Sequence, residues 1–175
     1  MLDQAQNPHR IDFGKTRGKT AGVSKLKAVG YSGSELLSSQ VPVQELRTAG
    51  RFSAAELHSL GVTLDGLREG GYPLRELKEQ IGLGVDVLRE AGYRAEDLED
   101  VGFSAKQLRA GGFDMAEMLN ECSFNAEEYR AAGLSAGELA LHLKLSIKEL
   151  REGGYSKKDI QGAGFAPAAV AQAFK

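Results

Sequence analysis

The stretch from Ala91 to Met118, AGYRAEDLEDVGFSAKQLRAGGFDMAEM, contains nearly the same phrase three times. Each copy starts with a glycine and an aromatic residue, continues with a polar residue, and has Leu or Met five residues after the aromatic. Ten residues cannot bury a hydrophobic core alone, so each copy must be one unit of a larger array whose neighbours bury one another.

The unit continues through most of the chain. We number it from the large apolar residue, position 1, which recurs every 10 or 11 residues at Tyr31, Val41, Phe52, Val62, Tyr72, Leu83, Tyr93, Phe103, Phe113, Phe124, Leu134, Leu145, Tyr155 and Phe165. Position 6 is apolar in all fourteen units: Leu36, Leu46, Leu57, Leu67, Leu77, Leu88, Leu98, Leu108, Met118, Tyr129, Leu139, Leu150, Ile160 and Val170. Grouping the intervals in threes gives 31 residues four times, which leaves open a coil of three helices.

Both ends of a short helix are encoded in each unit. In a capping box, a polar cap residue and a residue three positions later accept hydrogen bonds from each other's backbone amides. The sequence predicts eight such boxes: Ser32/Glu35, Ser53/Glu56, Ser104/Gln107, Asp114/Glu117, Asn125/Glu128, Ser135/Glu138, Ser146/Glu149 and Ser156/Asp159. Glycine precedes position 1 in ten of fourteen cases, where it can adopt the left-handed conformation that ends a helix. The exceptions are Gln40, Arg51, Ser123 and Lys144, and we expect Gly50 to replace the glycine before Phe52.

These signals predict an all-α fold, a solenoid-like array of about 14 very short helices over residues 23–175, preceded by an extended basic arm over residues 1–22. Helices this short are unstable alone in water, so stacking must stabilise them. Val23–Val29 is expected to be a degenerate first unit, and longer helices are expected around MLNECSF and LALHLKL. Cys122 should fill a core position, and Pro167 should lie near the start of the last helix.

Charge is distributed unevenly along the chain. The net charge is −2, but residues 1–30 carry six cations and two acids, a net +4, and the other 145 residues carry −6. The arm is therefore expected to bind a partner through Arg10, Lys15, Arg17 and Lys19. The single cysteine excludes an internal disulfide, and no apolar run approaches a membrane span or a secretory signal. We expect an intracellular protein of a reducing compartment, without membrane insertion.

Two local motifs suggest other chemistry. GKTRGKT at residues 14–20 resembles the end of a phosphate-binding loop, but only three residues separate Gly14 from Gly18 and no strand precedes them. LKEQIGLGVDVLREAG at residues 77–92 resembles a helix–hairpin–helix, a motif in which backbone amides hold a DNA phosphate. No other unit repeats its Gly-x-Gly, which favours an ordinary joint where Gly84 replaces the cap.

Position 7 often carries a cation. It is occupied by Arg47, His58, Arg68, Lys78, Arg89, Arg109, Arg130 and Arg151. One position repeated along a solenoid forms a stripe, and a stripe of cations could bind the carboxylates or phosphates of a partner. The candidate partner-binding residues are Arg47, Arg68, Lys78, Arg89, Arg109, Arg130 and Arg151. The plainer interpretation, which we favour, is that these cations stabilise helix C-termini and pair with nearby position-5 acids.

No pattern of catalytic or metal-ligating residues is evident. His9, His58 and His142 have no ligand set at metal-binding spacing, and Cys122 has no evident base partner. The recurring position-5 acids are explained by capping. We therefore expect no enzymatic activity, no cofactor and no small-molecule substrate.

The periodicity over residues 23–175 resembles that of α-helical tandem-repeat scaffolds, although its units are far shorter than those of ankyrin, TPR or HEAT repeats. The resemblance implies an extended surface for protein binding. The sequence thus predicts a subunit of a larger intracellular assembly, in which the acidic repeats dock along a protein partner and the basic arm threads onto it. The alternative is nucleic-acid association through the arm and the arginine ladder.

Overall fold

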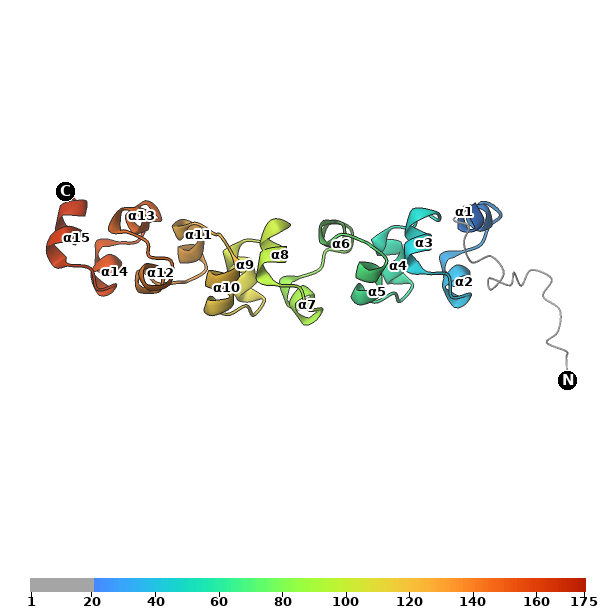
Figure 1. Ribbon diagram of the computed structural model, residues 1–175, viewed down its shortest axis with the longest axis horizontal. Helices are drawn as coiled ribbons and strands as arrows, with labels where there is room; N and C mark the ends of the chain where they lie inside the picture. The colour runs from blue at the N-terminus through green and yellow to red at the C-terminus, as the bar shows by residue number, and fades with distance from the viewer. Residues whose placement is uncertain (1–20) are drawn as a thin grey trace. The chain divides into compact units, whose positions relative to one another are not determined.

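The computed structural model of the chain describes residues 21–175, and this part is entirely helical (Figure 1). It contains fifteen short α-helices and, within the same range, no strand. The contacts divide the described part into two compact units, residues 21–82 (unit 1) and 83–175 (unit 2). Residues 1–20 of the predicted arm lie outside the described part, whereas Ala21 and Gly22 belong to the first helix.

The helices follow the predicted units one for one. Unit 1 contains α1 (Ala21–Ala28), α2 (Gly33–Ser38), α3 (Val43–Thr48), α4 (Ala54–Ser59), α5 (Leu64–Glu69) and α6 (Leu74–Ile81). Unit 2 contains α7 (Val85–Glu90), α8 (Ala95–Asp100), α9 (Ala105–Ala110), α10 (Met115–Glu121), α11 (Ala126–Ala131), α12 (Ala136–His142), α13 (Ile147–Glu152), α14 (Lys157–Gly162) and α15 (Pro167–Ala173).

The predicted array is confirmed, and the degenerate unit supplies the additional helix, α1. The expected lengthening is seen in α10 and α12, which have seven residues where most helices have six. Helix α6 has eight residues, which the sequence did not predict. The last helix begins at Pro167, as predicted.

Helix starts are closed by the predicted capping boxes, and all eight are present. At α13, for example, the Ser146 amide donates to the Glu149 carboxylate at 2.7 Å, and the Glu149 amide donates to the Ser146 hydroxyl at 3.3 Å. Each box satisfies two amide groups that a helix terminus leaves unpaired. A six-residue helix can therefore begin without help from its neighbours.

Helix ends are closed by left-handed residues. All ten predicted glycines have a positive φ, and at α9 the Gly112 and Phe113 amides donate to the Arg109 and Leu108 carbonyls at 3.2 and 3.1 Å. This pair of bonds defines the Schellman motif. It ties the amide of position 1 to the carbonyl of the preceding position 6, so each turn fixes the next position 1 beside the buried spine.

Three of the four units without this glycine also have a left-handed residue before position 1. Gln40, Arg51 and Lys144 have φ values of 59°, 52° and 58°. The expectation that Gly50 replaces the missing glycine is therefore wrong, because Arg51 itself is left-handed. Ser123 differs: the chain leaves α10 through Cys122 in an extended conformation, with φ −109°.

Position 6 forms the core of both units. All fourteen of its side chains have 0% exposure, and the equivalent Leu26 of α1 is also buried. Cys122 is buried as predicted. Within residues 22–175 no polar or charged side chain is buried. The interior of each unit is thus mainly apolar, and the polar groups inside it include tyrosine hydroxyls bonded to backbone carbonyls, such as Tyr72 to Phe52.

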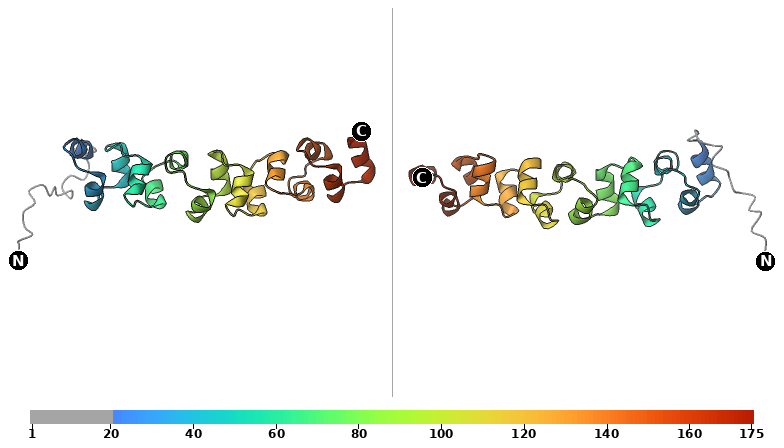
Figure 2. Two further views of the ribbon diagram at one scale, coloured as in Figure 1. Left: turned by 180° about the vertical axis from the view of Figure 1, so that it is seen from behind. Right: turned by 60° about the horizontal axis from the view of Figure 1, so that its bottom comes forward.

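Most of the larger helix–helix contacts within each unit join a helix to the second helix along the chain. In unit 1, α3 contacts α5 and α4 contacts α6. In unit 2, contacts link α7, α9, α11, α13 and α15 into one row, and they also pair α8 with α10 and α12 with α14 (Figures 1 and 2). The hydrogen bonds from Tyr72 to Phe52 and from Arg130 to Gly153 span 20 and 23 residues. The three-helix grouping is therefore wrong, because structural neighbours recur after two units.

The stacking contact joins the first residue of one helix to the C-terminal end of the second helix along. Val85 of α7 faces Gly111 at the end of α9, and Ala126 of α11 faces Gly153 at the end of α13. A Cβ built on Gly111 would lie 2.3 Å from Val85 Cγ1, and one on Gly153 would lie 2.4 Å from Ala126 Cβ. These glycines are therefore required by close approach between helices and not by a positive φ.

We expect Gly153→Ala to destabilise the protein by about 1–3 kcal/mol, because the added methyl group meets Ala126 Cβ and, at 2.9 Å, its backbone carbonyl carbon. The matched control is Gly162→Ala at the end of α14, where an added Cβ meets nothing within 4 Å. It should be neutral or stabilise by at most about 1 kcal/mol. Urea unfolding followed by circular dichroism measures both, and equal effects of the two substitutions would refute the stacking contact.

The capping boxes predict a loss of stability in acid. Hydrogen bonds from the amide of Ser146, and then from its hydroxyl, hold the pKa of Glu149 below its ordinary value, and the pKa values of Glu35, Glu56 and Asp159 are lowered in the same way. Because the folded-state pKa lies below the unfolded one, this stabilisation is present above the ordinary carboxyl pKa of about 4.3. It is lost as the pH falls through the lower folded-state pKa.

The melting temperature should therefore fall from about pH 5 downward, and Glu149→Gln should make this dependence shallower. The amide can replace the carboxylate in the box, as Gln107 does in this chain. Glu127→Gln is the control, because its side chain is exposed and makes no hydrogen bond with the described residues. An unchanged pH dependence in Glu149→Gln would contradict the assignment.

Candidate interaction surface

The position-7 cations follow the two-helix period. Every odd-numbered helix from α1 to α13 has Lys or Arg at this position, at intervals of 20 or 21 residues: Lys27, Arg47, Arg68, Arg89, Arg109, Arg130 and Arg151. The even-numbered helices α2 to α14 have Leu37, His58, Lys78, Glu99, Leu119, Ala140 and Gln161 there. Within unit 2 the predicted ladder thus belongs to the row formed by the odd-numbered helices.

Several of these cations contact the aromatic ring that follows the next odd-numbered helix. The Lys27 Nζ atom lies 4.0 Å from the centre of the Phe52 ring, and the guanidinium carbons of Arg47 and Arg89 lie 5.1 and 5.2 Å from the Tyr72 and Phe113 ring centres. Such cation–π contacts contribute about 0.5–1 kcal/mol at exposed sites. These contacts therefore link α1 to α3, α3 to α5 and α7 to α9.

The same cations also bind helix C-termini. Lys27 Nζ donates to the Gly50 carbonyl at 2.8 Å, and Arg130 Nε donates to the Gly153 carbonyl at 2.8 Å. Arg151 donates to the Ala173 carbonyl, and its guanidinium lies over the Phe174 ring. The last carbonyls of a helix are unpaired and carry the negative end of its dipole, so a cation is favourable there. The plainer interpretation of the ladder is consistent with these contacts.

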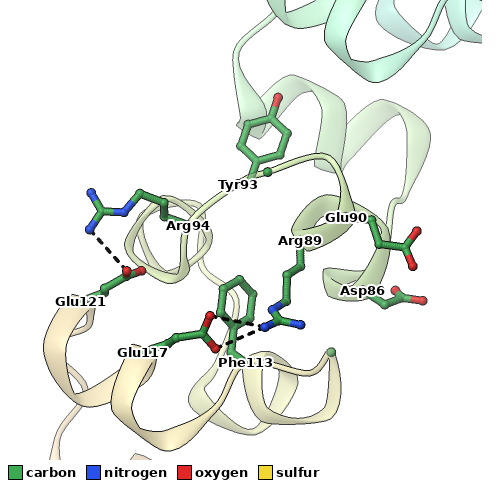
Figure 3. A pocket seen from close by; sticks show the side chains of 10 residues that line it. Asp86, Arg89, Glu90, Tyr93, Arg94, Phe113, Glu117 and Glu121 are labelled. Carbon is green, nitrogen blue, oxygen red and sulfur yellow. Dashed lines mark hydrogen bonds and ion pairs between the residues drawn. The ribbon is translucent and has the colours of Figure 1, made fainter.

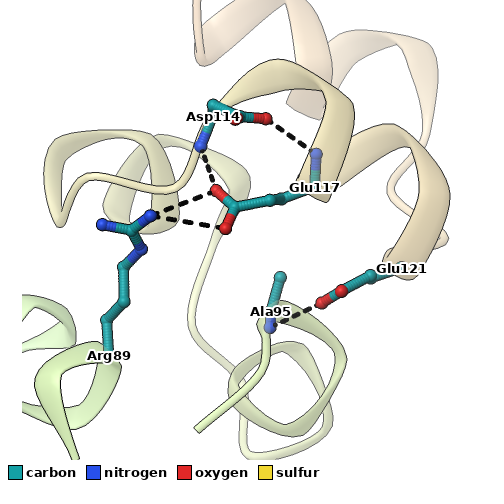
Figure 4. Close-up of polar contacts among 5 residues, drawn as sticks. All are labelled: Arg89, Ala95, Asp114, Glu117 and Glu121. Atoms are coloured by element: carbon teal, nitrogen blue, oxygen red, sulfur yellow. Dashed lines mark hydrogen bonds and ion pairs between the residues drawn. The ribbon is translucent and has the colours of Figure 1, made fainter. Parts of the chain in front are cut away.

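Acids of the even-numbered helices complete the network in unit 2. The Glu117 carboxylate accepts the Asp114 amide of its own capping box at 2.6 Å and Arg89 Nη2 at 3.3 Å (Figure 4). The Glu121 carboxylate accepts the Ala95 amide of α8 at 3.1 Å, and it lies 3.4 Å from Arg94. The Glu117 carboxylate thus caps its own helix, α10, and also binds Arg89 of α7. The ten-residue pattern of a single unit did not reveal this second contact.

The remaining predicted ladder residues are Arg68, Lys78 and Arg109. Arg68 pairs with Asp65 of its own helix at 2.9 Å, and Lys78 is half-buried on α6. The Arg109 side chain is exposed and makes no hydrogen bond or ion pair with residues 21–175. The side chains of four predicted ladder residues thus contact helix ends or aromatic rings of the chain itself and do not form a row of unengaged cations. These residues are Arg47, Arg89, Arg130 and Arg151.

One depression lies where the Arg89 contact is made (Figure 3). It is open to solvent, has a volume of about 380 Å³, and is lined by Arg89, Phe113 and Glu117 together with Asp86 and Glu90 of α7. Arg89 and Glu117 already bind each other in it. Asp86 and Glu90 are exposed on one face of α7 and have no ion pair within the described residues. This arrangement offers charged groups to a surface ligand but no enclosed reaction chamber.

A second open depression of about 690 Å³ lies between α11–α12 and α13–α14. Tyr155 in its wall donates to the Leu134 carbonyl at 2.7 Å, and burial raises the pKa of this tyrosine to about 12. Burial also raises the pKa of Cys122 to about 12, so its thiol stays protonated at neutral pH. Over residues 21–175, no group of His, Cys, Asp and Glu side chains is arranged to hold a metal ion.

The remaining predicted features are local. Gly82 is left-handed and Gly84 begins α7 without a side-chain cap, as expected for an ordinary repeat joint. The arm cations Arg10, Lys15, Arg17 and Lys19 and the GKTRGKT segment lie outside the described residues. No helix in the described part is both long enough and apolar enough to span a bilayer.

Comparison with known families supports a repeat protein. The sequence model of a family described as a decapeptide repeat region matches residues 82–142. No curated protein and no solved structure matches the chain. The matched segment covers the same 10- and 11-residue units that form α7 to α12.

We expect Arg89→Gln and Arg130→Gln each to destabilise the protein by about 1 kcal/mol, because each loses contacts to a ring, a carboxylate or a helix carbonyl at a partly exposed site. Arg109→Gln is the matched control, since it changes the same position of the same row but removes no contact within the described part. It should stay within about 0.5 kcal/mol of the parent. Chemical denaturation measures all three, and equal losses would show that the contacts do not hold the row.

Proposed function

We propose that this protein is a non-enzymatic interaction or structural scaffold, a subunit of a larger intracellular assembly. In this proposal the acidic repeat units dock along a protein partner, and the basic arm over residues 1–22 threads onto that partner. The proposal rests on the repeat architecture, which multiplies one short unit into an extended surface.

The observation that carries the proposal is the separation of apolar interior from polar surface. The buried side chains among residues 22–175 are hydrophobic residues, tyrosines included, and none of them is charged; both depressions are open to solvent. Enzyme sites usually combine a concave pocket with polar groups whose environment is partly desolvated. In this chain the polar groups instead repeat along the outside, where they can contact an extended partner.

Charge supports a two-part mode of binding. The first 30 residues carry a net +4 and the remainder −6, so the two parts favour different surfaces. The ladder contributes less to this than its composition suggests, because several of its guanidinium groups bind helix ends and rings. Arg10, Lys15, Arg17 and Lys19 of the arm are the main candidates for contacting an acidic partner.

The experiment is affinity purification of the full-length tagged protein from its native cells, at low and moderate salt, with nuclease treatment as a separate arm. The comparison variant replaces Arg10, Lys15, Arg17 and Lys19 with Gln and leaves the repeats unchanged. We expect a defined set of proteins that resists nuclease and is reduced in the variant. Recovery of nucleic acid that falls steeply with salt would instead support the nucleic-acid alternative.

A further inference from the structure

Position 8 contains one residue that departs from the pattern. In thirteen of the fourteen units it is Ser, Thr, Glu, Asp, Gln, Asn, Ala or Gly, and in the unit that forms α12 it is Leu141. Leu141 is 66% exposed, more than any other large hydrophobic side chain of unit 2. A single exposed leucine is ordinary on a protein surface. Its significance depends on the residues around it.

The joint that follows Leu141 departs from a second rule. Lys144 has φ 58°, the left-handed conformation that glycine adopts at ten other joints. This conformation is strained for a residue with a side chain, and strain of this kind often marks functional sites. Glycine would serve the fold at least as well, so the turn itself does not explain the lysine.

The nitrogen-bearing side chains of the joint are also free. The side chains of His142 and Lys144 are exposed and make no hydrogen bond or ion pair with residues 21–175. By contrast, the nearby Glu138 and Glu149 carboxylates bind the backbone amides of their capping boxes. An apolar side chain and two unengaged nitrogen-bearing side chains thus lie within four residues, which we call the Leu141 joint.

The segment around the Leu141 joint has a positive net charge, as Lys144 does. Residues 136–175 carry a net +2, whereas residues 31–135 carry −8. Helix α12 packs against α14, and α14 begins with the exposed Lys157 and Lys158. The Leu141 joint is therefore a cationic region with an apolar centre in an otherwise acidic series of repeats, and it is complementary to an acidic ligand.

We propose that the Leu141 joint docks an acidic segment of a partner protein, with an apolar side chain against Leu141 and carboxylates at Lys144 and His142. This proposal rests on the proposed scaffold function and specifies one of its binding sites. An anionic lipid surface fits less well, because interfacial helices insert a row of apolar residues and this joint offers one. Nucleic acid fits less well, because an apolar centre gains little from phosphates.

The probe is a fluorescein-labelled peptide of Glu and Asp residues with a central Phe, titrated with the full-length protein and followed by fluorescence anisotropy. Leu141→Ser should weaken binding about tenfold or more, and so should replacing the peptide's Phe by Ser. Val87→Ser is the matched control, because Val87 is an exposed apolar residue of the same unit away from the joint. It should leave binding unchanged.

Lys144→Gly separates this proposal from a merely structural role. It relieves a left-handed residue and should raise the melting temperature, yet it should weaken peptide binding severalfold. Gln40→Gly relieves the same strain in unit 1 and should raise the melting temperature without changing binding. Loss of binding with a gain in stability is not expected from a structural defect.

Several outcomes would overturn the proposal. The first two are that Leu141→Ser binds the acidic peptide as tightly as the parent protein does, or that a Lys- and Arg-containing peptide binds as tightly as the acidic one. The other two are that phosphatidylserine vesicles bind more tightly than the peptide, or that the protein self-associates through Leu141 in sedimentation equilibrium. The proposed function is tested separately by the purified complexes. If these retain every protein when Leu141→Ser is the bait, the scaffold function stands and the docking site fails.

Discussion

The architecture depends on a hydrogen bond that recurs at most joints, from the amide of position 1 to the carbonyl of the preceding position 6. A helix of six residues has more unpaired terminal groups than internal bonds, so it persists only if both ends are closed. The Schellman turn closes one end and directs the chain into the next capping box. Because the carbonyl belongs to a fully buried residue, the same bond attaches each turn to the spine.

Stacking adds a second level of order with twice the period. Pairs such as Val85 with Gly111 and Ala126 with Gly153 let one helix start rest against the end of the second helix along. The cation of the earlier helix then reaches the same end, as Arg130 does at the Gly153 carbonyl. Close approach, ring contact and charge thus act at one place. The ten-residue unit specifies a helix, whereas a pair of units specifies the packing.

The sequence predicted helix starts, helix ends and the buried spine, because each of these is decided by residues less than ten apart. It did not predict the two-helix contact, since the pairs that form it, such as Arg130 with Gly153, are 23 residues apart. A signal was present in the spacing from Lys27 to Arg151, but His58 and Lys78 fill the same position on α4 and α6 and obscure the alternation. The left-handed conformation of Arg51 was not predicted, because the neighbouring Gly50 could adopt that conformation with less strain.

The ladder shows why a repeated charge is weak evidence for binding in a repeat protein. Any interaction between successive helices must recur at the repeat period, so a periodic cation is expected even where no partner exists. Arg89 and Arg130 fit this explanation because their nitrogen atoms bind groups of the chain itself. A binding residue is better sought where periodicity fails without structural need. Leu141 and Lys144 both depart from the repeat pattern at one joint, and neither departure is required by the turn or by the buried spine.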